Sequence, residues 1–157
     1  MSLSGVGGAR ALPHLAGVPL HLTKVAFGAT SLDHLAERLR DRAADGPVFL
    51  TTRYLPKRHE EIVGEASGAG GGSLYWIIKH TLVARSPILG FGEAEGGRVA
   101  IHIDPALVLT EGRPKRAHQG WRYLEAADAP ADLGAGMIAG DAMPTALIAK
   151  LSALGLI

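Results

Sequence analysis

Apolar residues recur at strand spacing and then at helix spacing in the first third of the chain. Residues 19–27 are typical of a strand, and residues 30–46 predict an amphipathic helix whose leucines and alanines fall three or four residues apart. A capping pattern precedes this helix and Gly46 ends it. The rest of its surface carries charged side chains that we expect to face solvent, namely Glu37, Arg38, Arg40 and Arg42. A second short strand is expected over 48–53.

The middle of the chain predicts one more helix and a series of strands. A glycine-rich segment at 64–73, which we expect to be a flexible loop, separates helical spacing from strand spacing. The Gly96-Gly97 pair predicts a hairpin turn between two of the strands. In chain order, the predicted elements are a helix over 57–63, strands over 74–85, 88–91 and 99–104, a loop after Pro105 and a strand over 119–124.

The strongest strand signal, at 74–85, can be divided by parity, because side chains of one strand alternate between its two faces. The even-numbered positions are apolar except for His80, so this side is expected to face the core. Tyr75, Lys79 and Arg85 then share the other, less buried face. A histidine within an apolar row is usually a hydrogen-bonded core residue, and a buried catalytic base is the alternative.

The two ends of the chain carry different signals. Residues 1–18 predict a flexible arm, because Pro13 and His14 interrupt the apolar run that a signal peptide would need. Residues 143–154 predict a final amphipathic helix, whose apolar face offers a contact for a homodimer. No apolar run approaches the roughly 20 residues that span a bilayer. We therefore expect one domain over 19–157 and no membrane partner.

The order of the elements indicates the fold class. Strands and helices alternate only up to about residue 64, and strands then follow one another. This order argues against a doubly wound parallel sheet. We predict an α+β domain, with a curled, mainly antiparallel sheet or a small β-barrel flanked by helices.

Composition excludes several classes of protein. The chain has 157 residues, 47% of them hydrophobic, and 16 basic against 15 acidic side chains, which excludes a histone-like polycation or an acidic tail. It contains no cysteine, so a disulfide scaffold, an iron–sulfur cluster, a thiolate zinc site and a cysteine nucleophile are also excluded. We expect a cytoplasmic protein and predict neither a metal site nor a cofactor.

Basic and aromatic residues are interleaved between positions 53 and 123. Positive groups neutralise phosphates and flat rings stack on unpaired bases, so this mixture is typical of a surface that binds RNA or another nucleic acid. The competing interpretation is that the rings close the core and the charges merely solvate the surface. The candidate binding residues are Arg53, Tyr54, Lys57, Arg58, Tyr75, Lys79, Arg85, Arg113, Lys115, Arg116, Trp121, Arg122 and Tyr123.

Two other classes of function stay open. His102 and Asp104 share a strand face at a spacing suited to acid–base chemistry, and His80 is a second candidate for such a site. A small-molecule enzyme acting on an anionic ligand could use them. The third hypothesis is a structural protein that dimerises through its C-terminal helix. The sequence contains no serine-hydrolase elbow, and His59 lacks the second histidine of a zinc-protease motif.

Several motifs resemble a bacterial family. The segments are Arg53…Pro56-Lys57-Arg58…Glu61, Gly72-Ser73-Leu74-Tyr75-Trp76-Ile77-Ile78-Lys79, Ala84-Arg85, Asp104-Pro105 and Gln119-Gly120-Trp121-Arg122-Tyr123-Leu124. Together they resemble the domain-of-unknown-function family number fourteen eighty-nine, found mainly in alphaproteobacteria, from about residue 19 to the C-terminus. The N-terminal arm and the glycine-rich insertion depart from the family pattern. The family has no established activity, so the resemblance implies no catalytic residue.

The element order is also similar to that of PUA-like small barrels, which include the ASCH and EVE domains. A long central strand, a hairpin and a late strand followed by a helix carry this more distant resemblance, together with the segment 119–124. Such domains bind RNA or modified bases in a cleft beside the barrel. The resemblance therefore implies a nucleic-acid partner, and it uses some of the same residues as the argument from charge and aromaticity.

Overall fold

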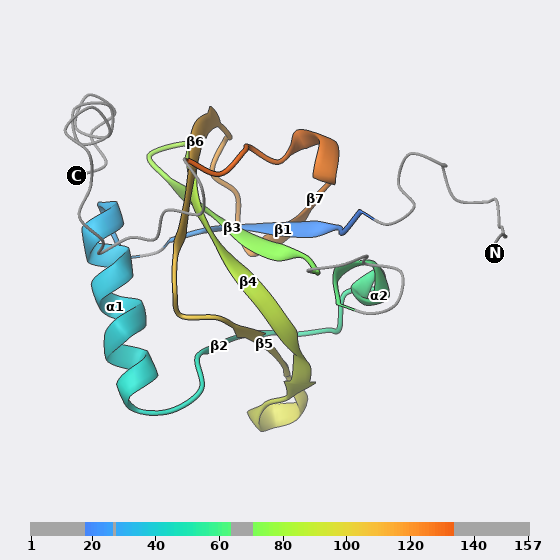
Figure 1. Cartoon of the computed structure of the whole chain (residues 1–157). Helices are drawn as coiled ribbons and strands as arrows, with labels where there is room; N and C mark the ends of the chain where they lie inside the picture. The colour runs from blue at the N-terminus through green and yellow to red at the C-terminus, as the bar shows by residue number, and fades with distance from the viewer. Residues whose placement is uncertain (1–17, 27, 64–70, 134–157) are drawn as a thin grey trace, which may run out of the picture.

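The computed structural model of the protein describes residues 18–26, 28–63 and 71–133 (Figure 1). Nearly all of the predicted N-terminal arm, most of the glycine-rich loop and the whole predicted helix at 143–154 lie outside the described residues. Within the described ranges, no helix combines the length and the apolar character that crossing a membrane requires.

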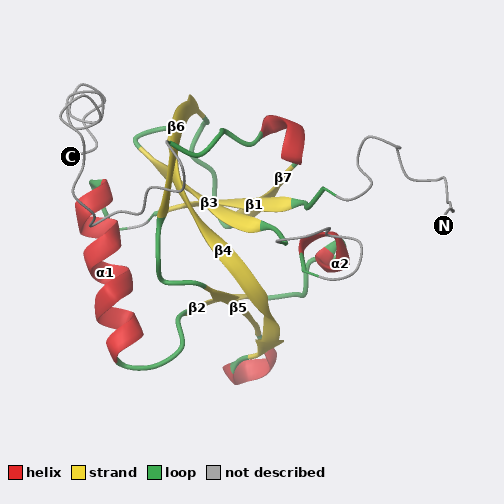
Figure 2. Cartoon of the chain, in the orientation of Figure 1, coloured by secondary structure: helices red, strands yellow, loops and turns green. Residues whose placement is uncertain are grey.

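Two helices, seven strands and two short 3-10 turns make up the described part of the chain (Figure 2). They are β1 (His21–Val25), α1 (Leu32–Ala44), β2 (Phe49–Thr52), α2 (His59–Ile62), β3 (Ser73–Ile78), β4 (Thr81–Glu93), β5 (Val99–Ile103), β6 (Val108–Pro114) and β7 (Trp121–Leu124), with 3-10 turns at Glu95–Gly97 and Ala126–Asp128.

All seven strands belong to one curled sheet in the order β2-β5-β4-β3-β1-β7, and β6 pairs with β4 outside this path. The long strand β4 is central to the sheet, because its first half pairs with both β3 and β6 and its second half pairs with β5. β1 and β3 run parallel, and the other neighbouring strands of the described sheet are antiparallel. The result is a half-barrel with α1 standing along one side (Figure 1), which confirms the predicted α+β class and its curled sheet.

Helix α1 follows the predicted apolar stripe closely. Leu32, Leu35 and Leu39 are buried against the sheet, as their spacing requires. The N-cap is Ser31, whose hydroxyl accepts a hydrogen bond from the backbone N–H of His34 at 3.1 Å. Both Thr30 and Ser31 are good capping residues, so the sequence pattern placed the start of the helix only to within one residue.

The prediction of a single strand over 74–85 is wrong. Lys79 and His80 both have positive φ angles, of 50° and 58°, and they form the tight turn between β3 and β4. Such turns usually contain Asn and Gly, so Lys-His gives no sequence signal. Because the turn reverses the chain, the parity argument fails beyond it. Tyr75 is buried and Arg85 half-buried, whereas His80 is exposed rather than in the core.

The loop expected after Pro105 is also partly wrong, because it contains β6. Leu109 and Thr110 are buried where β6 lies against β4, but Glu111–Pro114 are exposed. Charged residues and proline are common on edge strands, where they discourage pairing with other chains. These same residues led the sequence pattern to indicate a loop.

The sheet packs differently on its two faces. One face carries the main core, in which Leu22 and Trp76 lie against the leucines of α1. The other face carries a smaller cluster formed by Tyr75, Ile77, Leu82 and Leu124. Neighbouring residues of β3 therefore pack on opposite faces of the sheet.

Candidate functional site

The structure brings together two of the basic and aromatic segments that are far apart in the sequence. The indole Nε1 of Trp121 donates a hydrogen bond to the hydroxyl of Thr52 at 3.0 Å, and the hydroxyl of Tyr123 accepts one from the backbone N–H of Arg58 at 3.1 Å. The rings of Trp121 and Tyr123 lie edge to face, with centroids 5.0 Å apart, as expected for residues on one strand face. Strand β7 is therefore attached to the segment 52–58.

The charge of Arg58 is already matched within the protein. Its guanidinium donates two hydrogen bonds to the carboxylate of Glu61, at 2.7 and 2.8 Å, and a third to Glu125 at 3.0 Å. These bonds raise the pKa of Arg58, and they lower the pKa of Glu61. The guanidinium also lies 5.4 Å from the ring centroid of Tyr123. Arg58 thus connects α2, through Glu61, with the end of β7, through Glu125.

The other predicted binding residues differ widely in exposure. Tyr54 is the most open ring, with 73% of its surface exposed, whereas only 4% of Tyr75 is exposed. Arg85 donates to both carboxylate oxygens of Asp132, and Arg113 donates to the carbonyl oxygen of Asp128. The exposed predicted residues are Arg53, Tyr54, Lys57, Lys79, Arg113, Arg116 and Arg122, and the partly exposed ones are Arg58, Arg85, Lys115, Trp121 and Tyr123.

A cation lies between two tryptophans on the main-core face of the sheet. Lys24 of β1 pairs with Trp76 of β3 on one side and with Trp121 of β7 on the other. Directly paired residues on neighbouring strands project from the same face. Trp76, Lys24 and Trp121 therefore form a row across three strands, and the sequence pattern gave no sign of this row.

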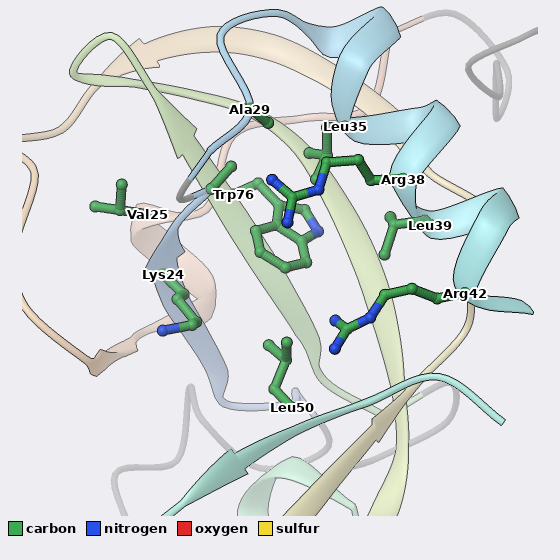
Figure 3. A pocket seen from close by; sticks show the side chains of 10 residues that line it. Lys24, Val25, Ala29, Leu35, Arg38, Leu39, Arg42, Leu50 and Trp76 are labelled. Atoms are coloured by element: carbon green, nitrogen blue, oxygen red, sulfur yellow. The ribbon is translucent and has the colours of Figure 1, made fainter.

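One end of this row opens into a pocket between α1 and the sheet, here called the Trp76 pocket (Figure 3). It has a volume of about 130 Å³. Arg38 and Arg42 reach from α1 toward Trp76, while Lys24 and Leu50 lie on the opposite side of the ring (Figure 3). The lining residues are Lys24, Val25, Ala26, Ala29, Leu35, Arg38, Leu39, Arg42, Leu50 and Trp76.

The chemistry of the Trp76 pocket favours an anion attached to a flat or apolar group. Three of its ten lining residues are cationic and none is acidic. Burial lowers the pKa of Lys24, because its ammonium has lost part of its hydration, and a bound anion would stabilise the charged form. The Trp76 indole donates to the hydroxyl of Ser86 at 2.8 Å, which fixes its orientation.

The three residues of the alternative enzyme hypothesis lie at different places in the fold: His102 in β5, Asp104 just after β5, and His80 in the turn between β3 and β4. The Asp104 carboxylate accepts a hydrogen bond from the backbone N–H of Ala106 at 2.9 Å, and the ring of His102 packs against Phe49. His80 Nδ1 accepts from the backbone N–H of Ala117 at 3.1 Å. Within the described ranges, no group of three histidine or carboxylate side chains is placed to hold a metal ion. A His/Asp site stays a prediction.

Sequence reasoning overlooked the cations of the Trp76 pocket for identifiable reasons. Arg38 and Arg42 are exposed on the surface of α1, as predicted, but their spacing of four residues, which places them side by side next to the apolar stripe, was not used in the prediction. Lys24 lies two residues after Leu22 and so shares the core-facing side of β1, which is an unusual position for a lysine. These two signals were available in the sequence, but the pairing of Lys24 with Trp121 required the fold.

Comparison with known proteins gives one match. Neither the curated proteins nor the solved structures include a significant match to the chain. A family model described as "Protein of unknown function (DUF1489)" matches residues 22–157, which include every described strand of the sheet except the first residue of β1, and both helices. The match covers far more than half of the sequence and agrees with the resemblance carried by its Tyr-Trp-Ile-Ile-Lys and Gly-Trp-Arg-Tyr-Leu segments. The chain belongs to the DUF1489 family.

Proposed function

We propose that this protein binds single-stranded nucleic acid, RNA in particular, at the opening of the Trp76 pocket between α1 and the sheet and along the neighbouring strand β7. Cations would contact phosphates and exposed or half-exposed rings would stack on bases. The observation that carries the proposal is the set of three cations, Lys24, Arg38 and Arg42, that line the Trp76 pocket beside the half-buried Trp121. Trp76 itself is only 4% exposed and forms a wall of the pocket, so stacking is assigned to Trp121 and Tyr54.

The bound strand would follow a path set by contacts between the elements. The Trp76 pocket supplies Arg38, Arg42 and Lys24. From there the path continues to Trp121, whose indole is hydrogen-bonded to the hydroxyl of Thr52. Thr52 is followed directly in the chain by Arg53 and Tyr54. Tyr54 is exposed enough to stack on a base without rearrangement.

The proposal assigns different roles to the cations predicted from the sequence. Arg58 and Arg85 are held by carboxylates. Phosphate contacts are assigned by position to the cations that line the Trp76 pocket, Lys24, Arg38 and Arg42, and to Arg53 and Lys57 in the segment that follows Thr52. Partnership with RNA agrees with the expected cytoplasmic location and with the more distant resemblance to PUA-like barrels, both of which stay predictions.

The proposal can be tested by fluorescence anisotropy with a labelled single-stranded oligouridine RNA. Each neutralised phosphate on a single strand contributes about −0.7 to the slope of log affinity against log salt concentration. We expect the double substitution Arg38→Gln/Arg42→Gln to weaken binding at least about tenfold and to make the slope shallower by about 1.4. Tyr54→Ala should weaken binding by about tenfold with little change in slope, because it removes stacking alone.

Helix α1 offers a matched control. Arg40→Gln removes the same charge from the same helix. Arg40 is exposed like Arg38 and Arg42, but it does not line the pocket. It should change the affinity less than about twofold. Affinity that does not depend on salt, absence of binding at low salt, or an equal loss with Arg40→Gln would overturn the proposal. Circular dichroism of each variant checks that the fold is retained.

A further inference from the structure

A histidine outside the Trp76 pocket connects the segment before β7 with the middle of β1. The Nε2 of His118 lies 2.7 Å from the hydroxyl oxygen of Thr23, and the two groups form a hydrogen bond. Thr23 pairs with Arg122 of β7, and directly paired residues project from the same face of a sheet. The side chains of Thr23, His118 and Arg122 therefore lie beside one another, on the face opposite to that of Lys24.

The loop that carries His118 is held by the turn between β3 and β4. The backbone N–H of Lys115 donates to the carbonyl oxygen of His80 at 2.9 Å, and the N–H of Ala117 donates to His80 Nδ1 at 3.1 Å. Strand β7 begins three residues after His118. Because the loop is attached at both ends, the fold sets the backbone positions of Lys115 and Arg122 before any ligand binds.

The charged groups that act on His118 are all cations. Partial burial lowers the pKa of His118, and the hydrogen bond between its Nδ1 and the carbonyl oxygen of Gln119 opposes this shift. Arg122, Lys115 and Lys24 lower the pKa further, because their positive charges repel a proton on the ring. Cations from β7, from the loop and from β1 therefore act on one point.

Among the described residues, Lys115 and Arg122 have no acidic partner. Neither side chain takes part in an ion pair or a hydrogen bond within these ranges, whereas the nearby Arg113 donates to the carbonyl oxygen of Asp128. Arg122 is exposed and Lys115 is partly exposed, so both can reach an anion in solvent. Holding like charges close together costs free energy, and an anion bound between them offsets this cost.

We propose that Lys115 and Arg122 form a binding site for a phosphate group beside His118, and that Lys24 adds to the positive field there. A phosphate suits several cations better than a carboxylate does, because it carries more negative charge and more oxygens that accept hydrogen bonds from an ammonium and a guanidinium together. The phosphate can belong to a nucleic-acid strand or to a small phosphorylated compound. Lys24 also lines the Trp76 pocket, but this His118 site does not depend on the nucleic-acid proposal.

The test is an NMR titration of the full chain with inorganic phosphate, in which the imidazole signals of His118 report binding. At about pH 7, with the ionic strength kept constant by sodium chloride, phosphate should move these signals saturably. It should also raise the pKa of His118, because a nearby anion favours the charged ring. Arg122→Gln should weaken phosphate binding at least about fivefold. Arg98→Gln removes the same charge at an exposed position before β5 and should leave phosphate binding unchanged.

Oligouridine RNA is the second probe, and it distinguishes the two sources of phosphate. Movement of the His118 signals with both probes supports a site for the phosphates of a strand, and movement with inorganic phosphate alone supports a site for a small phosphorylated compound. Arg38→Gln/Arg42→Gln, which tests the nucleic-acid proposal, should leave binding of inorganic phosphate at His118 unchanged, so the two proposals fail separately. His118 signals that do not respond to inorganic phosphate, or an equal affinity of wild type and Arg122→Gln, would contradict the inference.

Discussion

At the scale of single residues, the titration of His21 makes the stability of the protein depend on pH. Its pKa is about 4 in the folded protein, against 6.5 for an unperturbed histidine. The unfolded state therefore takes up a proton first as pH falls. We expect the free energy of unfolding to be constant for this group above about pH 7 and to decrease by roughly 3 kcal/mol in total between about pH 6.5 and pH 4. Urea denaturation at a series of pH values measures this decrease.

The asparagine variant at this position isolates the contribution of the histidine. His21→Asn keeps an acceptor at the position of Nδ1 for the Ser73 N–H but does not titrate. Its stability should change much less between pH 6.5 and pH 4. The pKa values of Glu61 and Asp132 are lowered by their arginine partners, so their contributions begin to fall only as pH approaches the unfolded values of 4.5 and 3.8. Above about pH 5 the difference between the two proteins therefore reports on His21. If both proteins lose the same stability over the histidine range, His21 is not the responsible group.

At the scale of elements, Gly72 joins α2, β3 and β4. Its N–H donates to the carbonyl of Ile62 at 2.7 Å, and its own carbonyl accepts from the N–H of Ile88 at 2.9 Å. A Cβ at this position would overlap the carbonyl oxygen of Leu20, and these backbone bonds prevent the chain from moving away. We expect Gly72→Ala to destabilise the protein by about 1–3 kcal/mol, measured by thermal or urea denaturation.

Gly90 is the matched control for this steric argument. It lies in β4, and an added Cβ would meet no atom within 4 Å. Gly90→Ala should therefore be close to neutral or slightly stabilising, because alanine restricts the unfolded chain. Equal destabilisation by the two substitutions would show that the contact with Leu20 does not decide the outcome.

At the scale of the whole molecule, the ion pair between Arg58 and Glu125 connects α2 with the strand β7, which begins more than sixty residues later. A double-mutant cycle of Arg58→Ala and Glu125→Ala measures the energy of this connection. The side chains of both residues are more than a third exposed, at 35% and 41%, so solvent screens the pair. We expect a coupling energy of about 0.5–1 kcal/mol in urea denaturation.

A cycle of Arg98→Ala with Glu125→Ala provides the comparison, since Arg98 is exposed beside the 3-10 turn at Glu95–Gly97 and makes no recorded ion pair in the described structure. Its coupling energy should be near zero. A value as large as that of the Arg58 cycle would mean that the energy arises from net charge and not from the connection between α2 and β7.

The sequence by itself determined the features of this protein that depend on local pattern. Leucines three or four residues apart can bury one stripe of a helix, so α1 could be predicted to within a residue at its start. The alternation of apolar positions located β1, β2, β5 and β7, and the loss of strand–helix alternation indicated the α+β class. The same alternation places Trp121 and Tyr123, two residues apart, on one face of β7, where their rings are in contact.

Only the tertiary structure decided which distant residues are in contact. Local periodicity shows which face of a strand is buried, but it does not show with which other strand that strand pairs. The turn at Lys79-His80 has no favourable turn sequence, yet it pairs Tyr75 with Arg85 across β3 and β4, beside His21. The placement of β1 between β3 and β7 sets Lys24 between two tryptophans. The folded chain also decides the surroundings of each charge. Arg58 forms ion pairs with carboxylates, whereas Arg38 and Arg42 lie around the ring of Trp76.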